Sequence, residues 1–171
     1  MTDFRLGVRD IVARVLEQRL PELQGRVYRA REWPLHEHQV PALLVYGYQE
    51  TKSGPEVHGG DVVYAVSCIM SVQAMTEAAS RHTEAVEREL EQLCQAICLA
   101  ILTAPELLGA AGAIERIDSV KTTLNIDAKT GEKALGQAVV AFELCWSETY
   151  QLPAEIPCAE TTFHFRVIPP A

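Results

Sequence analysis

The stretch Val62–Gln73, VVYAVSCIMSVQ, decides the fold of this 171-residue chain. Every second side chain is large and apolar, while most of the intervening ones are small or polar, and this period of two predicts a strand with one buried face. The alternating positions are Val62, Tyr64, Val66, Cys68, Met70 and Val72. The same alternation over residues 120–126 and 137–147 predicts two more strands. The polar segment Asp127–Glu132 between them predicts a hairpin.

Upstream of this stretch, the dense apolar run Ala42–Tyr48 predicts a central strand, with Val27–Arg31 as a short partner. Residues 4–20 and 86–101 predict amphipathic helices, because their apolar side chains recur three and four positions apart. Pro21 ends the first helix, since it lacks the donor that the next turn needs. Meandering strands with helices between them predict an α+β fold. We expect a mixed, largely antiparallel sheet of four to five strands with two helices packed on one face.

The amino-acid composition of the chain changes after Tyr150. We expect one α+β domain over residues 1–150 and a proline-rich, extended C-terminal arm over residues 151–171. Within the arm, Thr161–Ile168 alternates like a strand. Two interpretations stay open: an edge strand on its own subunit, or an arm that adds to the sheet edge of a neighbouring subunit through Phe163 and Phe165.

Composition excludes several classes of protein. The formal net charge is −8, the pI is about 5.1 and 48% of the residues are hydrophobic. A general nucleic-acid binder would carry a basic stripe, and a disordered chain would have fewer apolar residues. No run approaches the ~20 apolar residues of a membrane helix, and the first residues lack the profile of a signal peptide. We therefore expect a chain made in a reducing cytoplasm, with no membrane partner.

No catalytic signature is recognisable in the sequence. His36, His38 and His58 form the one metal-like cluster, but no acidic or cysteine partner has suitable spacing. Cys94 and Cys98 share a helix face with leucine and isoleucine, which favours a role in the core. We therefore expect no enzyme, no metal and no cofactor.

Charge is distributed unevenly, and this points to contact surfaces. Residues 1–33 contain seven arginines and five acidic residues, so nearly all of the negative excess follows them. Arginine and tryptophan are enriched at the centres of protein interfaces, and loops carry function more often than buried elements do. The segment Thr51–Gly60 is predicted to be a mobile, partner-facing loop between two strands. Its candidate contact residues are Lys52, Gly54, Pro55, His58 and Gly59. The candidate subunit-interface residues are Arg26, Arg29, Arg31, Trp33, Phe163 and Phe165.

Two short motifs carry a family resemblance. The stretch Val27–Leu35, VYRAREWPL, followed by Val40–Tyr46, VPALLVY, resembles the phage tail terminator proteins, the lambda-like minor tail or tail-completion proteins of siphophages, myophages and prophages. Glu148–Tyr150 stands where that family closes its last strand. The resemblance covers about residues 4–150 in element order, and the arm departs from the shorter family members.

The resemblance implies a structural virion protein of the phage tail, made in the cytoplasm of the bacterial host. It implies a homo-oligomeric ring, usually a hexamer, that caps the tail tube, ends its polymerisation and offers a surface to head-completion or connector proteins. DNA passes through such a ring without specific binding. The alternative is a non-viral α+β module that binds a protein or a small molecule, which would be a monomer or dimer with a pocket.

Overall fold

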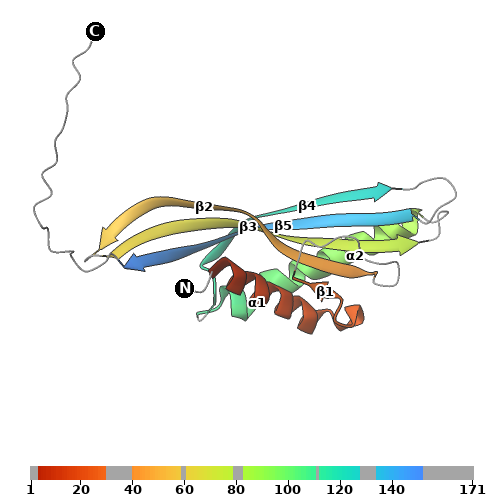
Figure 1. Ribbon diagram of the computed structural model, residues 1–171. Coiled ribbons are helices and arrows are strands. Elements are labelled where there is room, and N and C mark those ends of the chain that lie inside the picture. The colour runs from red at the N-terminus through yellow and green to blue at the C-terminus, as the bar shows by residue number, and fades with distance from the viewer. Residues whose placement is uncertain are drawn as a thin grey trace, which may run out of the picture.

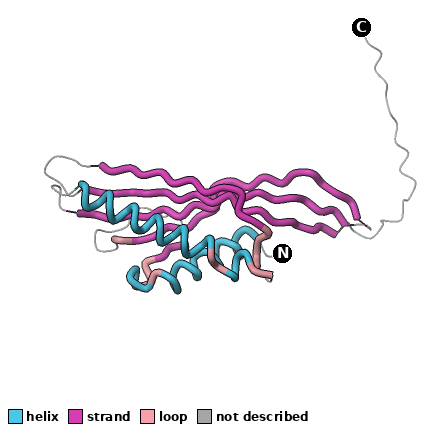
Figure 2. The backbone as a smooth tube through the Cα atoms, turned by 180° about the vertical axis from the view of Figure 1, so that it is seen from behind, coloured by secondary structure: helices cyan, strands magenta, loops and turns pink. Residues whose placement is uncertain are grey.

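A computed structural model describes residues 4–29, 40–58, 61–78, 83–110, 112–127 and 134–151. Five strands form one sheet in the order β1-β2-β3-β5-β4, and the helices lie on one side of it (Figures 1 and 2). Only β1 and β2 are parallel, and the other neighbours are antiparallel. The prediction of an α+β fold with a mixed, largely antiparallel sheet is therefore confirmed.

The elements follow one another in a simple order. Their bounds are α1 Phe4–Arg19, the 3-10 helix η1 Pro21–Leu23, β1 Val27–Tyr28, β2 Ala42–His58, β3 Asp61–Ala78, α2 Thr83–Leu102, α3 Pro105–Leu108, β4 Arg116–Asp127 and β5 Ala134–Gln151. The two predicted long helices are confirmed, and α3 and η1 are short additions. The expected hairpin partners β4 and β5 do pair antiparallel.

The core lies between the helices and one face of the sheet. Of the β3 positions that the alternation predicts to be buried, Val62 and Tyr64 are only half-buried, whereas Val66, Cys68, Met70 and Val72 are buried in the core. They pair in register with buried residues of β5, so the two central strands present one continuous apolar surface. The helices contribute residues such as Leu16 of α1. Burial of these apolar side chains is the main stabilising contribution of the fold.

The sheet is longer than the helices that cover it. The strand β3 has 18 residues, which at ~3.3 Å per residue is roughly 60 Å. The helices α1 and α2 have 16 and 20 residues, or roughly 24 and 30 Å at ~1.5 Å per residue. In both views the ends of β2, β3 and β5 therefore continue past the helices (Figures 1 and 2).

The prediction of a loop over Thr51–Gly60 is wrong. The strand β2 continues through His58, and β3 begins at Asp61, so most of this segment pairs within the sheet. Polar residues and Gly54 were the basis for the loop, but pairing with β3 outweighs these local preferences. The partner of β2 at its other edge is shorter than expected, because β1 ends at Tyr28 rather than at residue 31. The C-terminal arm lies outside the described residues.

Candidate functional site

The part of the sheet beyond the helices is the most distinctive surface of the molecule. We call it the extension, and it comprises Thr51–His58 of β2, Asp61–Ser67 of β3 and Cys145–Gln151 of β5. It is three strands wide, because β4 begins at Arg116, which pairs with Cys145. Residues 51–57 are all exposed. An unsupported three-stranded sheet is close to the limit of independent stability, so its side chains need explanation.

A compact polar and aromatic cluster stiffens the extension on its helix side. The Lys52 Nζ donates to Glu148 Oε2 at 2.5 Å and to the hydroxyl of Tyr150. The Tyr150 hydroxyl in turn donates to Glu148, and the indole Nε1 of Trp146 donates to the other oxygen of Glu148 at 3.0 Å. Tyr64 packs edge-on against Tyr150, with ring centroids 5.8 Å apart. These contacts join β2 to β5 across β3.

The hydrogen bonds of this cluster favour the charged forms of Lys52 and Glu148. Burial alone would raise the pKa of Glu148, but hydrogen bonds from Lys52, Tyr150 and Trp146 outweigh it and hold the pKa below its ordinary value. The hydrogen bond to Glu148, followed by that to Tyr150, raises the pKa of Lys52. Both groups therefore stay ionised near neutral pH, as a structural ion pair requires. Neither has the near-neutral pKa that general acid–base catalysis requires.

Where the extension meets the helices, α1 lies against the same face. The ring of Phe4 packs on Trp146 with centroids 5.3 Å apart, and Phe4 is still 42% exposed. On the extension itself Val57 is 68% exposed, and it pairs with Val62 beside Tyr150. Aromatic side chains are enriched at the centres of protein contact surfaces.

The opposite face of the sheet is polar near the base of the extension. Glu143 accepts hydrogen bonds from Ser67 at 2.9 Å and from Ser119 at 3.0 Å. Asp118 accepts from Arg116 at 2.6 Å and from the thiol of Cys145 at 3.2 Å. Burial, followed by the hydrogen bond to Asp118, raises the pKa of the Cys145 thiol. The protonated thiol is a poor nucleophile but can donate a hydrogen bond, as Cys145 does here to Asp118.

Two of the arginines predicted to face a partner, Arg26 and Arg29, have partners within the chain. Arg29 makes a paired contact with Glu17 of α1 at 2.8 and 3.1 Å and approaches Asp10 at 3.8 Å. The hydrogen bond to Glu17 raises the pKa of Arg29. Arg26 donates its Nε to the carbonyl oxygen of Leu23 at 3.0 Å. Both side chains therefore fix the connection between α1 and β1.

The other sequence candidates are scattered. Gly54 and Pro55 lie between Ser53 and Glu56, where the register of β2 against β3 shifts. Gly54 adopts a φ of +60°, and Pro55 is exposed. His58 is the last residue of β2. The remaining candidates lie outside the described residues: Arg31, Trp33, Gly59, Phe163, Phe165 and the histidines His36 and His38.

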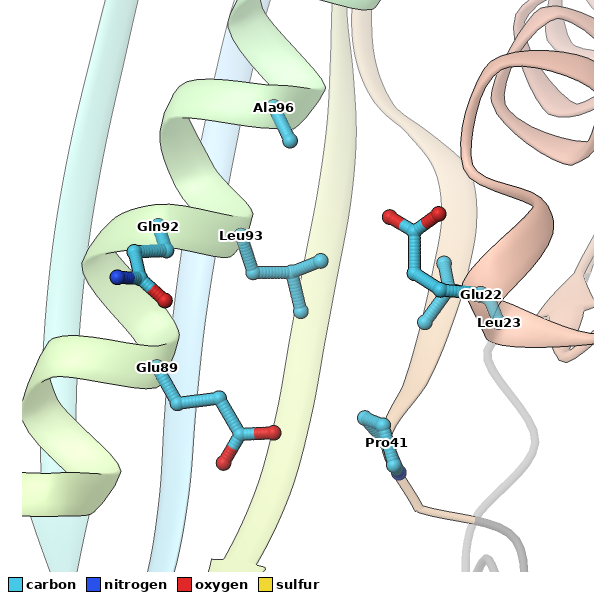
Figure 3. Close-up of a pocket in the computed structure, with 7 residues that line it drawn as sticks. All are labelled: Glu22, Leu23, Pro41, Glu89, Gln92, Leu93 and Ala96. Carbon is cyan, nitrogen blue, oxygen red and sulfur yellow. The ribbon is translucent and has the colours of Figure 1, made fainter.

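A groove of about 310 Å³ lies between η1 and α2 (Figure 3). Leu23, Leu93 and their apolar neighbours form its lining together with the carboxylates of Glu22 and Glu89. Glu89 accepts a hydrogen bond from Thr76 of β3 at 2.7 Å. The complete set of described lining residues is Glu22, Leu23, Pro41, Glu89, Gln92, Leu93 and Ala96.

Two further features are absent from the described ranges. No group of three or more histidine, cysteine, aspartate or glutamate side chains there could hold a metal ion. No helix in that part of the chain is long and apolar enough to cross a membrane.

Sequence reasoning identified Lys52 but missed Glu148, Tyr150, Trp146 and Tyr64 as its partners. A signal was available, because residues 146, 148 and 150 share one face of a strand. What the sequence does not display is the register that brings residue 52 to that face. No family model matches this chain, and a search of curated proteins finds no match either.

Proposed function

We propose that this chain is a structural subunit of a phage or prophage tail that forms a closed ring, caps the tail tube and offers a surface to head-completion or connector proteins. The resemblance of residues 27–46 supports the proposal. The observation that carries it is the extension, a long sheet segment left uncovered by the helices within the described residues.

A ring requires two different surfaces on each subunit, because a head-to-tail contact repeats around an axis until it closes. The extension lies at one end of the sheet, and the outer strand β4 lies beside the other half (Figure 1). The extension and the β4 side of the sheet differ in width, in the side chains that they present and in the strand that forms their edge. Contacts between unlike surfaces generate rings or filaments rather than twofold dimers.

The cluster around Lys52 supports a contact role for the extension. An interface segment that is already ordered loses little conformational freedom on binding, which preserves affinity. The hydrogen bonds of Glu148 provide that order, while Val57 remains exposed for a partner.

The acidic balance of the chain also suits a ring through which DNA passes. Phosphates bind basic walls strongly, and an acidic wall would let DNA slide. The outward positions Glu84, Glu87 and Glu91 of α2 are exposed and form such a surface. A ring in which lysine and arginine line the lumen would contradict this element of the proposal.

The test uses the full chain and a matched pair of surface variants. Val57→Asp places a charge on the extension, and Leu99→Asp places one on α2, where Leu99 is 67% exposed. Light scattering and electron microscopy would measure ring formation, with and without short tail tubes. We expect the parent and Leu99→Asp to form rings that stop tube growth and Val57→Asp to lose them. A parent chain that neither forms rings nor stops tube growth would refute the proposal.

The groove of Figure 3 favours a second candidate, a module that binds a small cationic or basic ligand. Its apolar lining and two carboxylates suit an amine with a hydrophobic body. A thermal-shift screen with aliphatic and aromatic amines would test this function. A monomeric protein stabilised by such an amine, with the effect lost in Glu22→Gln, would favour the module over the ring.

A further inference from the structure

The two outer edges of the sheet are protected to different degrees. At one side β1 pairs with β2 only at Leu43 and Leu44, so the rest of that edge belongs to β2 itself. At the other side β4 is the last strand along its whole length. An open strand edge recruits another strand unless local features prevent it.

The edge of β2 carries several such features. Its register shifts between Gly47 and Gln49 and again between Ser53 and Glu56. Gly54 lies in the left-handed region at φ +60°, and the proline that follows it has no N–H to donate. Bulges, proline and a positive φ all oppose edge pairing.

The edge of β4 is regular by comparison. After one shift between Ile117 and Ser119, it keeps register with β5 as far as Asp127. Val120 and Leu124 pair with the core residues Phe142 and Ala138, so they lie on the helix side of the sheet. They are nevertheless 39% and 37% exposed, because they form the apolar margin of a core that ends at this edge.

We propose that this edge of β4 accepts Thr161–Ile168 of a second copy of the chain as an additional strand. The inference rests on the ring proposed above and names the contact between neighbours. The segment alternates over eight residues, as long as the regular stretch from Ser119 to Ile126. Paired antiparallel, with Thr161 opposite Ile126 and Ile168 opposite Ser119, the segment would place Phe163 opposite Leu124 and Val167 opposite Val120 on the helix side of the sheet, with Phe165 between them. Strand addition of this kind gains affinity from main-chain hydrogen bonds and specificity from alternate side chains.

Geometry favours a second copy over the same chain. In this register Thr161 lies opposite Ile126, whose partner Gly136 comes fifteen residues before the end of β5 at Gln151. Returning to Ile126 means covering about 50 Å along the sheet and about 10 Å across it. The ten steps from residue 151 to residue 161 span about 36 Å at most when fully extended. In its own subunit the spacer is therefore too short, whereas a neighbour imposes no such distance.

Disulfide cross-linking between two differently tagged full-length chains tests the contact. Cys158 is first replaced by serine in both chains, because it lies close to the segment. One chain then carries Leu124→Cys and the other carries Phe163→Cys. The matched control replaces Leu124→Cys by Thr51→Cys, which lies on the protected edge of β2 and is also exposed.

We expect the 124–163 pair to form a disulfide between the two tagged chains at about tenfold or more above the 51–163 pair, since docking raises the local thiol concentration. Equal yields from the two pairs, or no product between chains, would overturn the inference. A chain carrying both Leu124→Cys and Phe163→Cys that gives only an internal disulfide would overturn it too. Rings that cap tubes without this cross-link would refute the strand addition and leave the proposed function standing. A cross-link between chains that do not cap tubes would support the strand addition and refute the proposed function.

Discussion

Gly136 of β5 lies where α2 packs most closely against the sheet, which makes Gly136→Ala a sharp test of the fold. A Cβ atom at this position would fall 2.9 Å from the Cδ1 of Leu90 and closer still to the Cγ1 of Val86. Real Cβ atoms essentially never approach other atoms this closely. Both neighbours are fully buried, so neither side chain can move into solvent.

The size of the effect follows from two opposing contributions. Forcing an extra methyl group into a packed core costs about 1–3 kcal/mol. Replacing glycine in a strand interior by alanine returns about 0.5–1 kcal/mol through the lower entropy of the unfolded chain. Because the contact with Val86 lies far below 3.0 Å, the packing cost falls in the upper part of its range, about 2–3 kcal/mol, and we expect Gly136→Ala to lower the free energy of unfolding by about 1–2.5 kcal/mol.

Urea titration followed by circular dichroism measures this free energy. Gly7→Ala is the matched control, because a Cβ at position 7 of α1 meets nothing within 4 Å. That control should raise the free energy of unfolding by about 0.5–1 kcal/mol, as glycine to alanine does in a helix. A Gly136→Ala protein as stable as the parent would show that α2 does not pack on β5 as described. Adding Val86→Ala should recover part of the loss, since it removes the closest methyl group.

Three further perturbations test other contacts. Arg29→Met should lower the free energy of unfolding by about 1 kcal/mol or less, because its pair with Glu17 is partly exposed; an equal loss in a Glu17→Gln background would show that the pair contributes nothing. The pKa of Glu148 is lowered in the folded protein, so the ionised side chain stabilises the fold above the ordinary glutamate pKa, and this stabilisation is lost as the pH falls through the folded pKa. Urea titrations between neutral and acidic pH should therefore show that Glu148→Gln reduces the loss of stability on acidification. A loss equal to that of the parent protein would contradict this assignment. Leu90→Ala should cost about 2–5 kcal/mol and more than Leu93→Ala, since Leu93 borders the groove and is 9% exposed; the reverse order in the same titration would mean that the core face of α2 is misassigned.

The long elements could be predicted from the sequence because each has an unbroken hydrophobic period. In β3 the buried set Val66, Cys68, Met70 and Val72 repeats every second residue. In α2 the buried set Val86, Leu90, Ile97 and Ile101 follows the helical period. These periods arise from the geometry of the backbone, so they hold without any knowledge of the partner element.

The end of β2 could not be predicted in the same way. Residues 51–57 are exposed, and the segment contains Gly54 and Pro55, so local preference favours a loop. What makes it a strand is pairing with β3 across the sheet, which no local pattern displays. Hydrophobic alternation fails wherever both faces of a strand meet solvent, and this is the condition of residues 51–57.

The candidate contact residues show the same limit at the level of single side chains. Arg29 was selected because arginines gather at interfaces, yet Glu17 and Asp10 of α1 already bind it. A charge that has partners within the chain needs a second reason to serve a neighbour. Lys52 is different, because its ion pair organises the extension without covering it. Sequence composition cannot separate these two cases, since the distinction depends on which faces the register brings together.

The unequal edges of the sheet have a consequence for assembly. If both edges were open, subunits could add side by side without limit, and a filament would compete with a ring. The register shifts of β2 and its exposed Pro55 oppose such growth, whereas the regular edge of β4 permits one added strand. The ring proposed above requires subunits that bind one another in a closed set and do not continue the tube. Restoring regular pairing at the β2 edge by deleting Gly54, which removes the one extra residue between Ser53 and Glu56, together with Pro55→Val should therefore shift a ring-forming protein toward open polymers, which sedimentation velocity would detect. Unchanged rings in that variant would show that the rotation between neighbouring subunits alone, and not protection of the β2 edge, limits the number of subunits that assemble.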